Sequence, residues 1–148
     1  MAKVYVLNSP RRVLNGLLRT LLTFGLGPAH SRLLSVRGRK SGHVYTTPVN
    51  LVHREGIDYL VSPYGNVSWT RNARAAHSVS LRRGGREQDF KIEALGAQEA
   101  APILRQYLDE NGITSPFFDV SGQSSDQEFI AEAPKHPAFR LQFEASKR

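Results

Sequence analysis

The stretch SVRGRKSGHVYTTPVN, residues 35–50, has the pattern of two β-strands joined by a short basic turn. We expect one strand over residues 33–36 and a second over residues 43–53, where β-branched side chains are frequent. Gly38 and Gly42 flank the turn, and glycine permits positive φ and a close backbone approach. The turn and its flank carry three cations, Arg37, Arg39 and Lys40. Such a hairpin tip is either solvated or holds an anion.

The turn contains the groups that a phosphate site needs. Exposed amide N–H groups in a turn can form an anion-binding concavity. Arg39 and Lys40 supply charge-assisted contacts, and Ser41 supplies a hydroxyl donor. The turn is not a Walker loop, because the GxxxxGK pattern is absent and no helix follows to add its dipole. By the residues alone, the solvated tip and the anion site remain equally open.

Composition narrows the class of protein. The chain has 148 residues, enough for one domain with one core, and 40% of them are hydrophobic. A net charge of +7 indicates an anionic partner, which is phosphate, nucleic acid or an anionic membrane. The absence of cysteine excludes disulfides and thiolate chemistry, and the five histidines have no ligand spacing, so we expect no metal. The arginines lack interleaved aromatic side chains, so we expect no nucleic acid.

Residues 10–24, PRRVLNGLLRTLLTF, predict an amphipathic helix with apolar side chains at positions 13, 14, 17, 18, 21 and 22. Ser9 is a candidate cap, and Gly25 ends the helix. The helix either packs on the domain, or it contacts a membrane or covers a ligand pocket. No apolar run is long enough to span a membrane, and the absence of cysteine is compatible with a cytosolic protein. We expect a cytoplasmic protein, with membrane association through this helix left open.

The remaining pattern predicts a small barrel. We expect further strands over residues 57–62, 79–82, 88–94 and 138–143, helices over 69–76 and 97–109, and a loop over 112–128. Ser68 is a candidate helix cap, and Pro48 suggests an edge position or a bulge. About six mainly antiparallel strands with peripheral helices indicate an α+β barrel. We expect a single domain, with residues 1–30 as helix and connector and 31–148 as the barrel.

Three segments, in this order, resemble the deazaflavin-dependent nitroreductase family of actinobacteria. They are GRKSG at residues 38–42, YLVSPYGNVSWTRNARAAHSVSLRR at 59–83, and HPAFRLQ at 136–142. The resemblance implies a split β-barrel related to FMN-binding, pyridoxamine-phosphate-oxidase-like proteins. It implies coenzyme F-420 as the cofactor, a deazaflavin with a phosphate and an oligoglutamate tail. FMN is the second choice.

The resemblance also implies which residues contact the coenzyme. The turn and the strand after it would hold its anionic part, through Arg39, Lys40, Ser41, Gly42, Tyr45, Thr46, Thr47 and Pro48. A second loop and the adjoining helix would meet it through Ser62, Pro63, Tyr64, Gly65, Trp69 and Asn72. Trp69 either stacks on the deazaflavin ring or anchors its helix in the core.

The implied activity is that of an oxidoreductase. Reduced deazaflavin would give a hydride to a small or lipophilic electrophile, such as a quinone or a nitro compound. Tyr64 is a candidate catalytic residue, as a proton donor. The alternative is a non-catalytic protein of the same fold that binds a deazaflavin or a fatty acid. Family barrels often pair, so the edge at Pro48 suggests a homodimer.

The chain departs from the family in its C-terminal part. Nitroreductase members line the substrate pocket with tyrosines there, whereas this chain has no Tyr after Tyr107. The aromatic residues nearby are Phe117, Phe118 and Phe129. They shape an apolar pocket but cannot donate a hydroxyl hydrogen bond, which puts nitroaromatic reduction in doubt.

Overall fold

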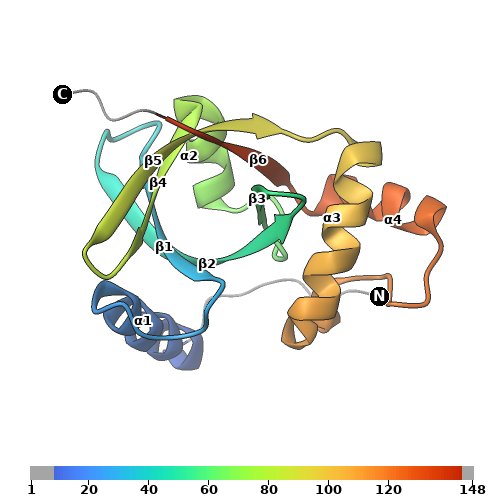
Figure 1. The fold of residues 1–148 in the computed structure, drawn as a ribbon, viewed down its shortest axis with the longest axis horizontal. Coiled ribbons are helices and arrows are strands. Elements are labelled where there is room, and N and C mark those ends of the chain that lie inside the picture. The colour runs from blue at the N-terminus through green and yellow to red at the C-terminus, as the bar shows by residue number, and fades with distance from the viewer. Residues whose placement is uncertain (1–8, 145–148) are drawn as a thin grey trace.

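The computed structural model describes residues 9–144, with side chains from residue 12 onward. Six strands form a closed barrel in the order β1-β2-β3-β6-β5-β4 (Figure 1), and every neighbouring pair is antiparallel. The strands are β1 (Ser31–Arg37), β2 (Val44–Arg54), β3 (Ile57–Val61), β4 (Ser78–Arg83), β5 (Arg86–Ala94) and β6 (Ala138–Phe143). The helices are α1 (Ser9–Thr23), α2 (Ser68–Ala76), α3 (Ala97–Glu110) and α4 (Asp126–Glu132). The predicted α+β barrel is confirmed.

The long strand β2 changes partner along its length. Residues 44–50 pair with β1, and residues 51–54 pair with β3. Pro48, opposite Leu33, therefore lies where β2 has a strand on one side only, within the part of the chain that is described. Proline lacks a donor and suits such an edge, so the predicted edge position is confirmed. A homodimer through this edge remains a prediction.

Alternation along the strands separates two cores. Inward-facing residues fill the barrel, among them Leu34, Leu60 and Phe139, and Ala73 from α2 closes one end of it. Outward-facing residues such as Val52 pack under α3 and α4, which lie together on one side of the barrel (Figure 1). The barrel is thus covered by α2 at one end and by two helices on one wall.

Helix α1 is attached mainly by its C-terminal end. Leu22 is fully buried, and its carbonyl oxygen accepts a hydrogen bond of 2.8 Å from the N–H of Gly84 at the β4–β5 hairpin tip. The apolar side chains of the preceding turns remain exposed, namely Val13, Leu14 and Leu17. Of the described helices, none is both long and apolar enough to cross a membrane. The predicted cap at Ser9 lies outside the described side chains, and the proposed division at residues 30 and 31 remains a prediction.

The contact between α1 and the hairpin tip gives a testable expectation about two neighbouring glycines. Gly84 has φ +62°, and a Cβ there would lie 3.2 Å from the Cα of Gly25. We expect Gly84→Ala to lower the free energy of unfolding by about 1–3 kcal/mol, measured by denaturant titration. Gly85 has open space around its Cα, so Gly85→Ala should be close to neutral. Equal losses in both variants would contradict the close approach of α1 to this hairpin.

Two local predictions were wrong. The expected loop over residues 112–128 contains a 3-10 helix, Gly112–Phe117, and the start of α4. The N-terminus of α4 is a capping box: Ser125 Oγ accepts from the N–H of Glu128, and Glu128 Oε1 accepts from the N–H of Ser125. Ser68 is the first residue of α2 and not its cap, which is Val67 without a side-chain hydrogen bond.

Candidate functional site

Three segments predicted to meet the coenzyme come together at the end of the barrel that α2 covers. The β1–β2 turn, residues 38–43, reaches α2 through Arg39. Asn72 Oδ1 accepts two hydrogen bonds from Arg39, one from its backbone N–H at 3.1 Å and one from Nη1 at 2.7 Å. Asn72 is buried, and residues 62–65 lead into the same helix. The turn is therefore fixed against α2 rather than free in solvent.

The turn and α2 carry positive charge without acidic neighbours in sequence. No Asp or Glu precedes Glu55, and none lies between Asp58 and Glu87. Within residues 9–144, neither Arg39 nor Lys40 has a carboxylate partner. The exposed cations of the turn, of α2 and of the last residue of β1 are Arg37, Arg39, Lys40, Arg71 and Arg74. This face consequently attracts anions.

The backbone of the turn offers donors as well as charge. Gly38 N–H and Gly42 N–H are used inside the turn, bonded to His43 O at 2.7 Å and to Gly38 O at 3.0 Å. The N–H groups of Lys40 and Ser41 have no acceptor within the described chain, and both residues are exposed. Gly42 has φ +74° with open space around its Cα. Two unused amides beside two cations suit a phosphate or carboxylate, so the turn fits the anionic part of a deazaflavin coenzyme.

The strand after the turn is tied to it by side chains. The hydroxyl groups of Ser41 and Tyr45 are 3.2 Å apart, and Ser41 Oγ also accepts from the N–H of His43 at 3.2 Å. Tyr45 is exposed, whereas Thr46, Thr47 and Pro48 are half-buried. Arg19 of α1 donates from Nη2 to the carbonyl oxygen of Thr46 at 3.1 Å. Side-chain hydrogen bonds thus connect β2 both to the turn and to α1.

The four predicted residues of the second loop, residues 62–65, differ in how exposed they are. Ser62 is buried and donates to the carbonyl oxygen of Gly65 at 2.5 Å, and Pro63 is also buried. Tyr64 is 38% exposed, and its ring meets Phe117 edge to face, with centroids 4.9 Å apart. Ser62 and Pro63 therefore shape the loop, while Tyr64 offers a side chain to a ligand.

A buried ionisable pair holds this loop to the C-terminal part, and the sequence analysis did not find it. His136 Nδ1 lies 2.9 Å from the carbonyl oxygen of Pro63, and Nε2 lies 2.7 Å from Glu132 Oε2. Because a carbonyl oxygen only accepts, Nδ1 carries the proton and donates to Pro63. Glu132 and His136 are four residues apart in the sequence, but His136 lies beyond α4 and the 3-10 helix Ala133–Lys135, so helical periodicity did not indicate the pair.

The buried carboxylate of Glu132 is fully used. Besides His136, it accepts from the N–H of Asp119 at 3.1 Å and from Lys135 Nζ at 3.3 Å. Phe118 stacks on the imidazole of His136 at a centroid distance of 3.9 Å. Pro63 therefore lies against a buried cluster of hydrogen-bonded polar groups.

The predicted aromatic residues have separate roles. Of the three phenylalanines, Phe117 alone is seen to contact Tyr64, whereas Phe118 is buried against His136 and Phe129 is buried under Arg105. Trp69 packs against Phe139 in the barrel at 6.0 Å, which supports its role as an anchor for α2. Stacking of Trp69 on a ring remains a prediction.

A buried phenol lies near Tyr64. Burial raises the pKa of Tyr107 well above its ordinary value, the neighbouring Tyr64 raises it further, and a hydrogen bond with the Asn50 side chain opposes the change. Asn50 is in turn bonded to Asn111 at 2.8 Å. Tyr107 therefore stays protonated and belongs to the framework beneath the loop.

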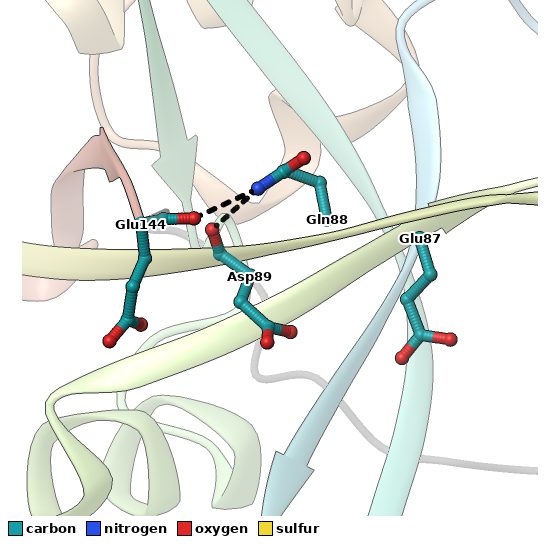
Figure 2. Close-up of a pocket in the computed structure, with 4 residues that line it drawn as sticks. All are labelled: Glu87, Gln88, Asp89 and Glu144. Atoms are coloured by element: carbon teal, nitrogen blue, oxygen red, sulfur yellow. Dashed lines mark hydrogen bonds between the residues drawn. The ribbon is translucent and has the colours of Figure 1, made fainter. Parts of the chain in front are cut away.

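A small hollow on the barrel surface differs in charge from this site. It has a volume of about 240 Å³ and is lined by Glu87, Gln88, Asp89 and Glu144 (Figure 2). The Gln88 amide nitrogen donates to the backbone carbonyls of Asp89 at 3.2 Å and Glu144 at 3.1 Å. Three carboxylates repel a polyanion, so this hollow is no candidate for the coenzyme tail.

Solved structures share the fold of the chain. An F420-H2 dependent reductase, FDR-A, has a TM-score of 0.54 at 19% identity, over 77% of this chain and 95% of that one. A structure described as a domain-swapped dimer has a TM-score of 0.55 at 18% identity, over 90% of this chain and 100% of that one. A putative pyridoxamine 5'-phosphate oxidase from Listeria innocua has a TM-score of 0.53 at 11% identity, over 90% of this chain and 92% of that one.

Sequence comparison gives the family. No curated protein matches the chain. A family model does match it over residues 14–120, and its description is F420H(2)-dependent quinone reductase. That span includes the basic turn, the second loop and α2, so the predicted coenzyme F-420 and reductase class are confirmed. The chain belongs to the family of F-420-dependent quinone reductases.

Proposed function

We propose that this reductase holds coenzyme F-420 at the α2 end of the barrel and reduces a lipophilic quinone there. The observation that carries the proposal is the pair of hydrogen bonds from Arg39 to Asn72. These bonds hold Arg39 and the backbone of the turn, with its two unused amides, against α2, the helix into which residues 62–65 lead. A fixed donor set loses little entropy on binding, which favours a tight grip on an anion.

Each part of the proposed site has a distinct task. Arg39, Lys40 and the amide N–H groups of residues 40 and 41 would hold the phosphate and carboxylates of the coenzyme. The strand from Tyr45 to Pro48 would line the path toward Tyr64. In its reduced form, bound coenzyme F-420 supplies a hydride, which together with a proton converts a quinone to its quinol. The chain contributes orientation, charge complementarity and exclusion of water.

The acceptor would lie against Tyr64 and Phe117. Their edge-to-face pair offers an apolar surface to a flat ring. The Tyr64 hydroxyl is the proposed proton donor, since the Tyr107 phenol is buried. A planar, apolar quinone suits this surface, and a nitro compound is the alternative acceptor.

Turnover measurements test the acceptor and the role of Tyr64. We expect reduced coenzyme F-420 to be oxidised by a water-soluble naphthoquinone in the presence of the protein. Tyr64→Phe should lower kcat by about tenfold to a hundredfold, because general acid catalysis typically contributes that much or more, and it should change coenzyme affinity less, because the ring is kept. Tyr59→Phe is the matched control, because Tyr59 is a tyrosine buried in the core between the barrel wall and helices α3 and α4.

Three results would contradict parts of this proposal. Unchanged kcat in Tyr64→Phe removes Tyr64 as the donor. Tight binding of coenzyme F-420 without turnover of any quinone or nitroaromatic favours the non-catalytic binding protein. Tight FMN binding with no affinity for coenzyme F-420 contradicts the proposal as a whole.

We also propose that α1 contacts an anionic membrane, where lipophilic quinones reside. Val13, Leu14 and Leu17 are 72%, 59% and 57% exposed, and two arginines of the same helix, Arg12 and Arg19, lie off this apolar stripe. An amphipathic helix with exposed apolar side chains and arginines on its polar face is typical of helices at a membrane surface.

Co-sedimentation with vesicles that contain phosphatidylglycerol tests this contact. We expect the unchanged protein to sediment with them and Leu14→Glu/Leu17→Glu to remain in solution. Asn15→Glu/Thr20→Glu makes the same change in charge off the apolar stripe, and it should retain most of the binding. Absence of the unchanged protein from the vesicle pellet would contradict the proposal.

A further inference from the structure

A larger cavity opens at the barrel mouth far from α2. It has a volume of about 610 Å³, and its lining includes three arginines, Arg32, Arg83 and Arg86. Arg32 lies at the start of β1 and Arg83 at the end of β4, whereas the end of β1 leads to the turn that meets α2. The cavity is therefore separate from the proposed coenzyme site.

The charges of two of these arginines, Arg32 and Arg83, repel each other, and Asp58, which also lines the cavity, offsets only part of the effect on Arg32. Burial lowers the pKa of Arg32, the charge of Arg83 lowers it further, and Asp58 opposes both effects. Asp58 is itself bonded to His53 Nδ1 at 2.7 Å. Within residues 9–144, neither Arg32 nor Arg83 forms an ion pair with a carboxylate. An anion between the two guanidinium groups would relieve this repulsion.

The connector before β1 fixes both guanidinium groups. Arg32 Nη1 donates to the carbonyl oxygens of Ala29 and Ser31, both at 2.8 Å. Arg83 Nη1 donates to Pro28 O at 2.7 Å, and its Nη2 donates to Gly27 O at 2.9 Å. Three nitrogen atoms donate no hydrogen bond within the described chain, namely Arg32 Nε, Arg32 Nη2 and Arg83 Nε. They are not buried away from solvent, because the described side chains contain no buried polar atom without a partner. These donors are thus held in place and reachable by solvent.

The same cavity has an apolar side. Leu81, Phe90 and Phe143 line it, and the two phenylalanine rings meet edge to face at 6.0 Å. Phe143 is 74% exposed at the rim. Glu87 also lines the cavity and adjoins the acidic hollow of Figure 2, which disfavours a ligand with many negative charges.

We propose that this barrel mouth binds a small organic anion. Its carboxylate or phosphate would lie between the guanidinium groups of Arg32 and Arg83, and its apolar body would pack against Phe90 and Phe143. Arg32 suits such anions because its Nε and Nη2 form an edge that can donate two parallel hydrogen bonds, and Arg83 adds its Nε and its charge. The site does not depend on coenzyme binding at the other end of the barrel.

Amide chemical shifts of the ¹⁵N-labelled protein test the site with four probes: phenyl phosphate, benzoate, inorganic phosphate and benzyl alcohol. We expect phenyl phosphate and benzoate to shift the amides of residues 31–33 and 81–88 saturably. Inorganic phosphate and benzyl alcohol should bind there at least about tenfold more weakly, since each lacks one half of the recognition. The proposal is supported whichever of the two aromatic anions binds more tightly. The tighter one shows whether the site prefers a phosphate or a carboxylate.

Two variants distinguish the contribution of the arginine charge to binding from that of the apolar side of the cavity. Arg32→Gln should weaken phenyl phosphate by about tenfold or more, whereas the exposed Arg54→Gln should not. Because Arg32 also holds the connector, Phe143→Ser is a second variant that leaves both guanidinium groups intact. It should weaken phenyl phosphate and leave inorganic phosphate unchanged. Shifts confined to residues 38–42, or equal binding by Arg32→Gln and Arg54→Gln, would overturn the proposal.

Discussion

Arg39→Ala/Lys40→Ala is expected to bind oxidised coenzyme F-420 about a hundredfold more weakly than the unchanged protein. Each side chain would make a charge-assisted contact worth about 1.5–3 kcal/mol, and about 1.4 kcal/mol corresponds to a factor of ten. Neither cation has a carboxylate partner in the described chain, so truncation leaves no other buried charge behind. Fluorescence titration of the coenzyme measures the change.

A matched pair of substitutions separates the turn from the overall charge. Arg12→Ala/Arg54→Ala also removes two positive charges, from exposed positions outside the turn and α2. We expect its affinity to stay within about threefold, because exposed charges beyond about 10 Å are largely screened at 0.1 M salt. Added salt should weaken the unchanged protein more than Arg39→Ala/Lys40→Ala. Equal losses in the two double variants would contradict a specific grip at the turn.

Glu132→Ala is expected to lower the free energy of unfolding by about 3–5 kcal/mol, because removing one partner of a buried pair leaves the other uncompensated. The donors left without their acceptor would be His136 Nε2 and the N–H of Asp119, whereas Lys135 Nζ would keep its bond to Asp119 Oδ2 at 3.0 Å. Urea denaturation measures the loss, provided that the dependence of the unfolding free energy on urea concentration is the same in both proteins.

Two further variants define what Glu132 contributes. Asp126→Ala removes an exposed carboxylate 3.0 Å from Arg105, and we expect a cost of about 1 kcal/mol or less. Glu132→Gln nearly preserves the volume, so a large loss there would assign the effect to charge and hydrogen bonding. A loss below about 1 kcal/mol in both Glu132 variants would contradict the structural role of this pair.

The barrel was predictable because strand patterns and turn residues act locally. Alternation and glycine positions around residues 35–50 gave β1 and β2 to within a few residues. The same local reasoning missed α4, since the Ser125–Glu128 capping box lies in a segment whose composition is typical of a loop. A short helix needs its cap to be recognised before its weak periodicity is informative.

The candidate site was predictable only in part. Arg39 and Lys40 were found because a basic turn between glycines is a local signal. The partner of Arg39 was not predictable as such, because Asn72 is 33 positions away in the sequence. Ser62 and Pro63 were assigned to a loop, but no sequence pattern shows that their side chains point into the protein and that His136 supports them.

The location of the coenzyme is the central claim, and amide chemical shifts during titration with oxidised coenzyme F-420 test it most directly. Saturable shifts should be largest at residues 38–42 and 62–65, with smaller ones along residues 45–48. Shifts confined to the barrel mouth, at residues 31–33 and 81–88, with residues 38–42 unchanged, would contradict the account.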